Sequence, residues 1–278
     1  ERAEVGAGGL ARTGVWADLC TTMAIPLFHR QIGDSTGPSL IILHGLLGAS
    51  DNWQTLAKRY AATHSVHLLD ARNHGRSPHD PVHTYAAMVE DAVAFMDQQG
   101  IEKARVMGHS MGGKTALLLA MQHPERVERL IVADMSARAY PVHHQPIFEA
   151  LMSVDPGTAE DRADVEQHLA ERLGDPSIVA FLMKGLRRRK SGGFAWRANL
   201  PVLESALGEI VGAVDLSINT LPCLAVYGKR SSYVCEADLA AFDAAFLQFE
   251  SHGIEGAGHW LHAERPDEFF TATADFLA

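Results

Sequence analysis

The chain has 278 residues, and 47% of them are hydrophobic, so it can bury the core of one large domain and is not mainly disordered. Its formal net charge of −10 argues against nucleic-acid binding, because phosphate neutralisation needs a clustered basic face. No apolar run approaches the roughly 20 residues that cross a bilayer, so we expect no membrane span.

The first residues of the chain and its cysteines indicate the cellular compartment in which we expect the protein. Residues 1–22 hold no signal-type apolar segment, and we expect them to form an N-terminal tail. The three cysteines are an odd count without metal-ligand spacing, which fits a reducing compartment: Cys20, Cys223 and Cys235. We therefore expect a cytoplasmic protein. Because residue 1 is not Met, an organelle matrix reached after removal of a targeting peptide is the alternative.

Short β-like runs alternate with longer amphipathic runs through residues 39–136. The β-like runs read SLIILHG, SVHLLDA, ARVMGHS and VERLIVADM, and the amphipathic runs between them read NWQTLAKRYAA, YAAMVEDAVAFMDQQG and KTALLLAMQHP. Such alternation predicts a parallel sheet covered by helices on both faces. Two further strands, LPCLAVYG and FESHGIEGAGH, and a terminal helix, PDEFFTATADFL, continue the pattern after residue 218.

The run VMGHSMGGKTALLLA places Ser110 between glycines where a strand-like pattern changes to a helix-like one. Gly108 and Gly112 would let the backbone turn sharply and present Ser110 as a nucleophile, although an ordinary strand-to-helix turn would use the same glycines. The following helix would direct its free N–H groups, beginning with that of Met111, at a developing oxyanion. We expect the second donor to be Leu46 N–H in LHGLLG, unless that segment is a plain glycine turn.

Between residues 137 and 217 the strand–helix alternation fails, and a helix-rich stretch with proline and glycine breaks takes its place. An insertion of this size between strands commonly forms a cap over a site, so we expect a helical cap here. Its aromatic side chains could line an acyl pocket or pack within the cap: Phe148, Phe181, Phe194 and Trp196. The basic run at residues 187–190 is interpreted as a solvated face.

A serine hydroxyl needs a base, and His259 in GAGHWLHAERPDEF has the best claim because it lies in a glycine loop after the last strand. His262 follows three residues later, and such a pair could bind a metal ion. No third ligand motif such as HExxH or CxxC is nearby, so we expect no metal. His143 and His144 are interpreted as surface or cap residues, whereas His44 and Trp260 are candidate substrate contacts beside the site.

Five motifs in order, HGLLGASDNW, DARNHGRSP, GHSMGGKTA, WRANLPVL and GAGHWLHAERPDEF, resemble those of the α/β-hydrolase superfamily. The resemblance spans about residues 25–277, and the motifs are more narrowly similar to those of the abhydrolase-domain carboxylesterases shared by bacteria and mitochondria. It implies a mostly parallel eight-stranded sheet, a helical cap inserted after the sixth strand, a Ser–His–acid triad and no cofactor. The core would comprise residues 23–136 and 218–278, and the cap residues 137–217.

The acid of that implied triad departs from the common pattern. Many of these enzymes carry an Asp just after the strand that reads CLAVYG here, but this chain has Ser231 and Ser232 at that place. Asp134 closes the earlier strand in IVADMS, and members with the acid on that strand resemble this arrangement. Asp238 and Glu236 are the alternatives if the later loop folds back.

These residues predict hydrolysis of a small-molecule carboxylic ester, or a thioester, with short to medium acyl chains through an acyl-enzyme. A C–C bond hydrolase or lyase with the same triad is the alternative, because the cap sets the substrate. A non-enzymatic scaffold would be expected to have lost a triad element, whereas Ser110 and His259 are both present.

Overall fold

The computed structural model describes residues 23–33 and 36–278. The tail expected at residues 1–22, with Cys20, lies outside the described residues. Within the described part, no helix is long and apolar enough to cross a bilayer.

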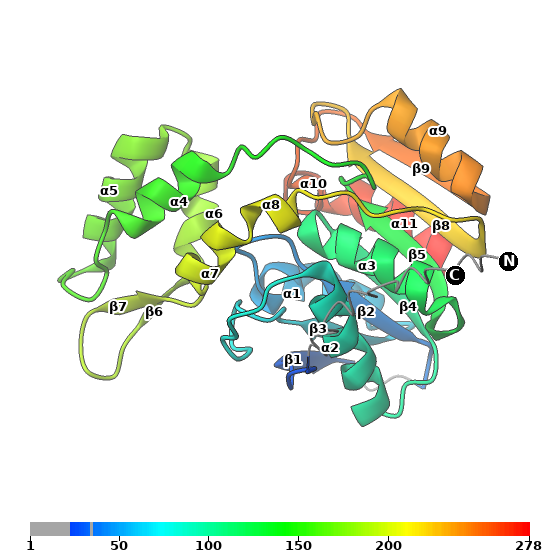
Figure 1. Cartoon of the computed structure of the whole chain (residues 1–278), viewed down its shortest axis with the longest axis horizontal. Helices are drawn as coiled ribbons and strands as arrows, with labels where there is room; N and C mark the ends of the chain where they lie inside the picture. Colours follow the sequence, from blue (N-terminus) through cyan, green and yellow to red (C-terminus); the bar gives the residue numbers. More distant parts are fainter. Residues whose placement is uncertain (1–22, 34–35) are drawn as a thin grey trace, which may run out of the picture.

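A twisted sheet of seven strands, in the order β1-β3-β2-β4-β5-β8-β9, forms the centre of the described molecule (Figure 1). All neighbours pair in parallel except the edge strand β1, which is antiparallel to β3. The strands are β1 (His29–Ile32), β2 (Ser39–Leu43), β3 (Ser65–Leu69), β4 (Ala104–His109), β5 (Val127–Ala133), β8 (Asn219–Gly228) and β9 (Phe246–Ile254).

The strand count corrects one expectation. The described residues form seven strands in this sheet rather than eight, and the inserted segment follows the fifth strand in chain order rather than the sixth. The sequence did not indicate β1, because HRQI is short, largely polar and only half-buried at the sheet edge. Residues 23–28 lead into β1 without joining a ladder.

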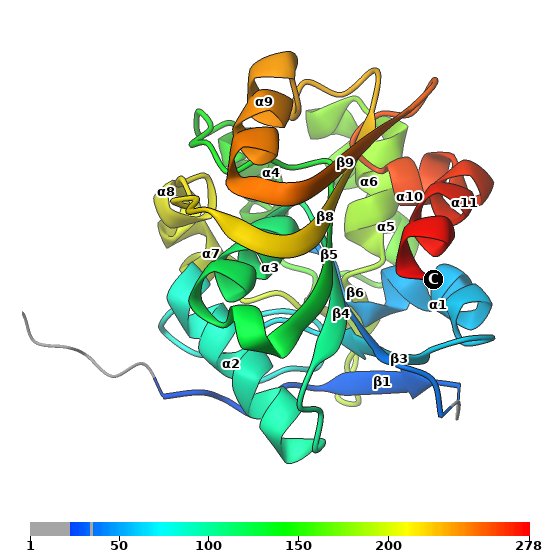
Figure 2. The same cartoon turned by 90° about the vertical axis from the view of Figure 1, so that its right-hand side faces the viewer.

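Helices cover both faces of the sheet, as the alternation predicts (Figure 2). On one face lie α2 (Tyr85–Gln98), α3 (Met111–Gln122) and α9 (Glu236–Ala245), which bury Ile41 and Leu43 of β2. On the other lie α1 (Gln54–Tyr60), α10 (Leu261–Glu264) and α11 (Pro266–Leu277), which bury Leu40 and Ile42. Two apolar cores on opposite faces follow from the two-residue period of strand side chains.

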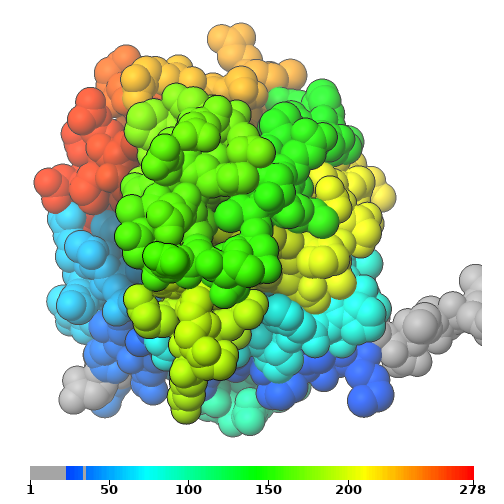
Figure 3. All heavy atoms as spheres, turned by 90° about the vertical axis from the view of Figure 1, so that its left-hand side faces the viewer, coloured from blue at the N-terminus to red at the C-terminus, as the bar shows by residue number. Residues whose placement is uncertain are grey.

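The helices and the hairpin of residues 137–217 lie to one side of the sheet in Figure 1 and in front of it in Figure 3. They form α4 (Gln145–Met152), α5 (Arg162–Leu173), α6 (Pro176–Met183), β6 (Leu186–Arg188), β7 (Phe194–Trp196), α7 (Leu200–Ser205) and α8 (Leu207–Ile210). The segment contributes most of a third apolar cluster. The basic run lies in the β6–β7 hairpin, where its side chains are exposed.

The two ends of this segment are joined where they leave the core. Val214 N–H donates to Ala137 O at 2.7 Å, and Tyr140 N–H donates to Val211 O at 2.8 Å. The buried ammonium of Lys114 in α3 donates to Arg138 O at one end and Gly212 O at the other. The helix that follows Ser110 therefore also anchors the base of the inserted segment.

Candidate active site

Ser110 sits at the sharp turn between β4 and α3, with φ 54° and ψ −120°. Non-glycine residues rarely adopt this conformation, and such strain is concentrated at functional sites. The turn needs both flanking glycines, because a Cβ on Gly108 would lie 2.1 Å from Gly112 O and one on Gly112 would lie 2.3 Å from Leu43 O. The sequence G-H-S-M-G thus folds into a tight elbow that holds the serine above the end of the sheet.

His259 bridges Ser110 and Asp134. Its Nε2 lies 3.1 Å from Ser110 Oγ, and its Nδ1 lies 2.7 Å from Asp134 Oδ2. Both distances are within hydrogen-bonding range for a base, the group it deprotonates and the group that orients the base. The three residues come from the ends of β4 and β5 and from the loop after β9, which the parallel sheet brings to one edge.

The carboxylate of Asp134 is fully buried and held on both oxygens. Gly228 N–H donates to Oδ1 at 3.0 Å, and Ser231 Oγ donates to Oδ2 at 2.5 Å. The end of β8 and the loop after it therefore supply hydrogen-bond donors to an acid at the end of β5.

Neither alternative acid contacts His259 in the structure. Asp238 lies 3.0 Å from the Nε of Arg138 and accepts the N–H of Cys235 at 2.9 Å, at the start of α9. Glu236 is exposed on the first turn of the same helix. Of the three carboxylates considered, Asp134 alone meets the hydrogen-bond distance to His259 Nδ1.

The two proposed oxyanion donors lie on either side of Ser110, Leu46 in the loop after β2 and Met111 at the start of α3. A Cβ on Gly45 would lie 3.1 Å from Ser110 Cβ, so the loop at residues 44–48 packs directly against the serine. Among the described residues, the N–H of Leu46 donates to no acceptor in the turn, and the N–H of Met111, the first residue of α3, has no acceptor within the helix. Both N–H groups are therefore free to bind an oxygen atom.

Two buried histidines fix this loop. Ala71 N–H donates to His44 Nε2 at 3.0 Å, so the ring proton is on Nδ1, which donates to Gly45 O at 2.8 Å. Leu47 N–H donates to His74 Nε2 at 3.1 Å in the same manner. Burial lowers the pKa of both imidazoles, which keeps them neutral at pH 7 and able to accept these N–H groups. His44 lines the site, but both of its ring nitrogens bond to backbone groups.

A cavity of about 240 Å³ adjoins Ser110 and His259. Its walls come from the 44–53 region, the inserted segment and the loops after β8 and β9, and they are largely apolar. Phe181 and Trp260 line it, with their ring centroids 5.3 Å apart. A ligand in this cavity would therefore touch both the core and the inserted segment.

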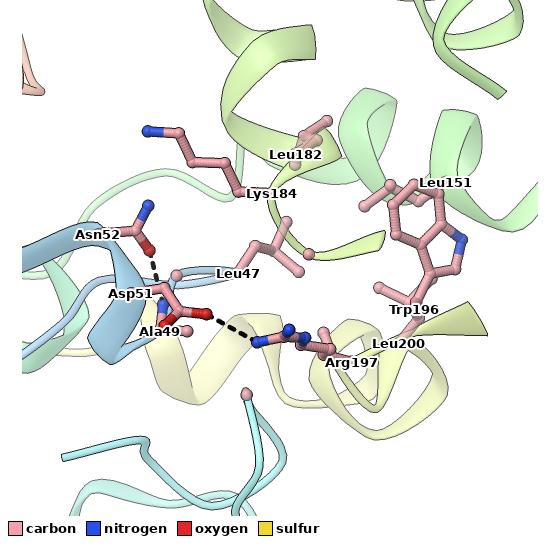
Figure 4. Close-up of a pocket in the computed structure, with 14 residues that line it drawn as sticks. Leu47, Ala49, Asp51, Asn52, Leu151, Leu182, Lys184, Trp196, Arg197 and Leu200 are labelled. Carbon is pink, nitrogen blue, oxygen red and sulfur yellow. Dashed lines mark hydrogen bonds and ion pairs between the residues drawn. The ribbon is translucent and has the colours of Figure 1, made fainter. Parts of the chain in front are cut away.

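The predicted contacts of Phe148, Phe194 and Trp196 with this cavity are wrong. Phe148 and Phe194 are 0% and 5% exposed and belong to the apolar cluster within the inserted segment, which is the alternative that the sequence left open for them. Trp196 lines a neighbouring cavity with Leu47 and Leu182 (Figure 4). Across that cavity, Arg197 of the inserted segment pairs with Asp51 of the core at 2.9 Å.

Five further side chains line the cavity beside Ser110, although the sequence did not indicate that they would: His109, His143, His144, Tyr233 and His262. His109 Nε2 lies 2.8 Å from His259 O, so it supports the backbone of that residue. His262 stacks on Trp53 at 4.2 Å, and burial lowers its pKa to about 3. The described residues contain no group of three or more His, Cys, Asp or Glu side chains that could hold a metal ion. The place of His109 and His262 at the cavity could have been predicted from the sequence, because both lie within three residues of a predicted triad member.

Comparisons with known proteins agree with this architecture. The model of the alpha/beta hydrolase fold family matches residues 38–266. The chain is 36% identical to esterase YbfF of Escherichia coli over 239 residues, covering 86% of this chain and 92% of that protein. It is 35% identical to the mouse sn-1-specific diacylglycerol lipase ABHD11, covering 91% and 86%. A solved marine microorganism esterase superposes with a TM-score of 0.88 at 36% identity, covering 91% and 100%. The chain therefore belongs to the α/β-hydrolase family.

Proposed function

We propose that this protein hydrolyses carboxylic esters with Ser110 as the nucleophile, His259 as the base and Asp134 as the acid that orients it. The observation that carries the proposal is the pair of contacts made by His259, 3.1 Å to Ser110 Oγ and 2.7 Å to Asp134 Oδ2. Names of similar proteins, an esterase and a diacylglycerol lipase, support the same reaction class.

In the proposed reaction, Ser110 Oγ attacks the ester carbonyl carbon while His259 Nε2 accepts the hydroxyl proton. The carbonyl oxygen becomes an oxyanion, which the N–H groups of Leu46 and Met111 stabilise together with the N-terminus of α3. The imidazolium then protonates the departing alkoxide, leaving an acyl-enzyme on Ser110. A water molecule activated by His259 releases the acid by the same steps in reverse order.

The largely apolar cavity supports a neutral substrate with a short to medium acyl chain. Ile147, Ile178 and Phe181 of residues 137–217 lie in its wall, and we propose that this segment is the cap that selects the chain. The core would then comprise residues 23–136 and 218–278. Thioesters enter the same mechanism, because their carbonyl carbon is attacked in the same way.

A chain-length screen tests the proposal. We expect turnover of p-nitrophenyl esters from acetate to laurate with a maximum at short or medium chains, and acyl-CoA substrates compared in parallel show whether thioesters are also cleaved. Ser110→Ala should abolish turnover without changing the fold. If that variant kept a tenth or more of the wild-type rate, the proposed nucleophile would be wrong.

A further inference from the structure

Tyr233 covers one face of the His259 imidazole. The two rings are stacked with centroids 4.0 Å apart and an interplanar angle of 20°. Tyr233 belongs to the loop after β8 and lines the cavity beside His259. The proposed reaction mechanism assigns this tyrosine no role.

Three hydrogen bonds hold Tyr233 in this position. Its carbonyl oxygen accepts the hydroxyl of Tyr140 at 2.7 Å, and its N–H donates to Ser231 Oγ at 3.2 Å. Its own hydroxyl lies 2.6 Å from Nε2 of His143 in the inserted segment. The main chain and the ring tip of Tyr233 are thus fixed independently, which leaves the ring little freedom to leave the stack.

The second hydrogen bond of His143 determines which atom donates between the Tyr233 hydroxyl and His143 Nε2. His143 Nδ1 lies 2.8 Å from Pro141 O, which only accepts, so the ring proton is on Nδ1 and Nε2 accepts the Tyr233 hydroxyl. Burial, with a contribution from the charge of Asp134, raises the pKa of Tyr233 to about 12. The phenol therefore keeps its proton, and its ring remains tied to residues 137–217 throughout the neutral pH range.

The stack matters most when His259 carries a proton. The face of an aromatic ring attracts a cation, and this attraction is absent when the imidazole is neutral. The other groups around His259 are the Asp134 carboxylate, Trp260, and the imidazoles of His109, His144 and His262. Burial lowers the pKa of these three imidazoles, so they stay neutral and do not oppose the charge.

We propose that Tyr233 is a positioning residue for ester cleavage, which holds the plane of the His259 ring and favours its imidazolium form through the stacked aromatic face. This inference rests on the proposed roles of Ser110 and His259. The hydroxyl bond to His143 joins the stack to the inserted segment, so a change in that segment's position would reach the imidazole through Tyr233.

Two substitutions separate the ring from its hydroxyl. Tyr233→Phe keeps the stacked face and loses the bond to His143. Tyr233→Leu keeps an apolar side chain over the imidazole and removes the aromatic face. The readout is the pH dependence of the rate at which a fluorophosphonate inactivates the enzyme, whose acid limb reports protonation of the base in the free enzyme.

For Tyr233→Leu we expect the midpoint of the acid limb to move to lower pH by about 0.4–0.7 unit and kcat for an ester to fall about 2- to 5-fold, since the imidazolium loses its aromatic partner. Tyr233→Phe should keep the wild-type midpoint. Trp260→Leu is the matched control, because its ring is 6.2 Å from that of His259 and tilted by 57°. It should change KM and leave the midpoint in place.

The outcomes distinguish this inference from the proposed function. An unmoved acid limb in Tyr233→Leu, in an enzyme whose inactivation still depends on Ser110 and His259, would refute the role of Tyr233 alone. A fall in kcat without a shift would mean that the tyrosine only packs there. If wild-type protein did not react at Ser110 at all, the proposed function itself would fail.

Discussion

Asp134→Asn changes a side chain whose two oxygen atoms both accept hydrogen bonds in the site. Oδ2 faces the Nδ1 of His259 and the hydroxyl of Ser231, while Oδ1 accepts the N–H of Gly228. If the amide oxygen keeps the bond to Gly228, its NH₂ group faces His259 and forces Nδ1 to accept a hydrogen bond. The proton of His259 then moves to Nε2, where it can no longer take a proton from Ser110.

The expected loss of kcat is large. In serine proteases the same replacement costs about 10⁴ in kcat because it selects the wrong tautomer, and we expect about 10³–10⁴ here. The opposite orientation of the amide does not restore activity at low cost, because it places the NH₂ group of the asparagine against the N–H of Gly228, and both groups are donors. The melting temperature should change little, because a neutral amide relieves the cost of burying a carboxylate and this offsets the weaker hydrogen bonds.

Hydrolysis of a p-nitrophenyl ester, with melting temperature measured in parallel, is the assay. Asp238→Asn and Glu236→Gln serve as controls and should keep most of the wild-type kcat, because neither side chain reaches His259. The reasoning would be refuted if Asp238→Asn were the crippling change and Asp134→Asn were mild.

The remaining predictions concern packing, the cavity and pH. Gly112→Ala should destabilise the fold by about 1–3 kcal/mol or more in urea unfolding, since its Cβ meets Leu43 O at 2.3 Å, whereas Gly208→Ala, with open space around it, should be tolerated. Phe181→Ala should shift esterase preference toward longer acyl chains, while Phe148→Ala should cost about 3–5 kcal/mol of stability and leave the preference unchanged. Burial lowers the pKa of His67, His83 and His144 to about 4 and that of His262 to about 3. The free energy of unfolding should therefore fall as pH drops from about 6.5 toward 4, by about 1 kcal/mol per pH unit for each of these histidines, because the unfolded chain binds protons that the folded chain does not. A melting temperature that stays constant over this range would contradict the lowered pKa values.

Local patterns made much of the core predictable from the sequence. The elbow at Ser110 is a short-range feature, in which two glycines are required because a Cβ atom at either position would lie within 2.3 Å of a backbone oxygen of the turn or of β2. The loop that carries His259 follows a strand whose parallel pairing takes it to the same edge of the sheet as Ser110. Parallel strands place their carboxyl ends together, so residues far apart in the chain could be expected to meet.

Side chains in the inserted segment were less predictable. Phe148 and Phe181 both lie on apolar helix faces, but one points into the segment and the other into the cavity. Which face of a short helix meets which neighbour depends on helix packing, and the sequence pattern does not specify it. Tyr233 was missed for a different reason, since its contact with His259 depends on the path of an irregular loop stabilised by Ser231 and Tyr140.

Trapping of the acyl-enzyme tests the central claim most directly. Acid quenching of the protein during turnover of a p-nitrophenyl ester, followed by peptide mass spectrometry, should find the acyl group on Ser110 and on no other residue. The adduct should accumulate in His259→Ala only at a greatly reduced rate, because that variant lacks the base. An acyl group on a different side chain, or steady turnover by Ser110→Ala at a tenth or more of the wild-type rate, would contradict the account.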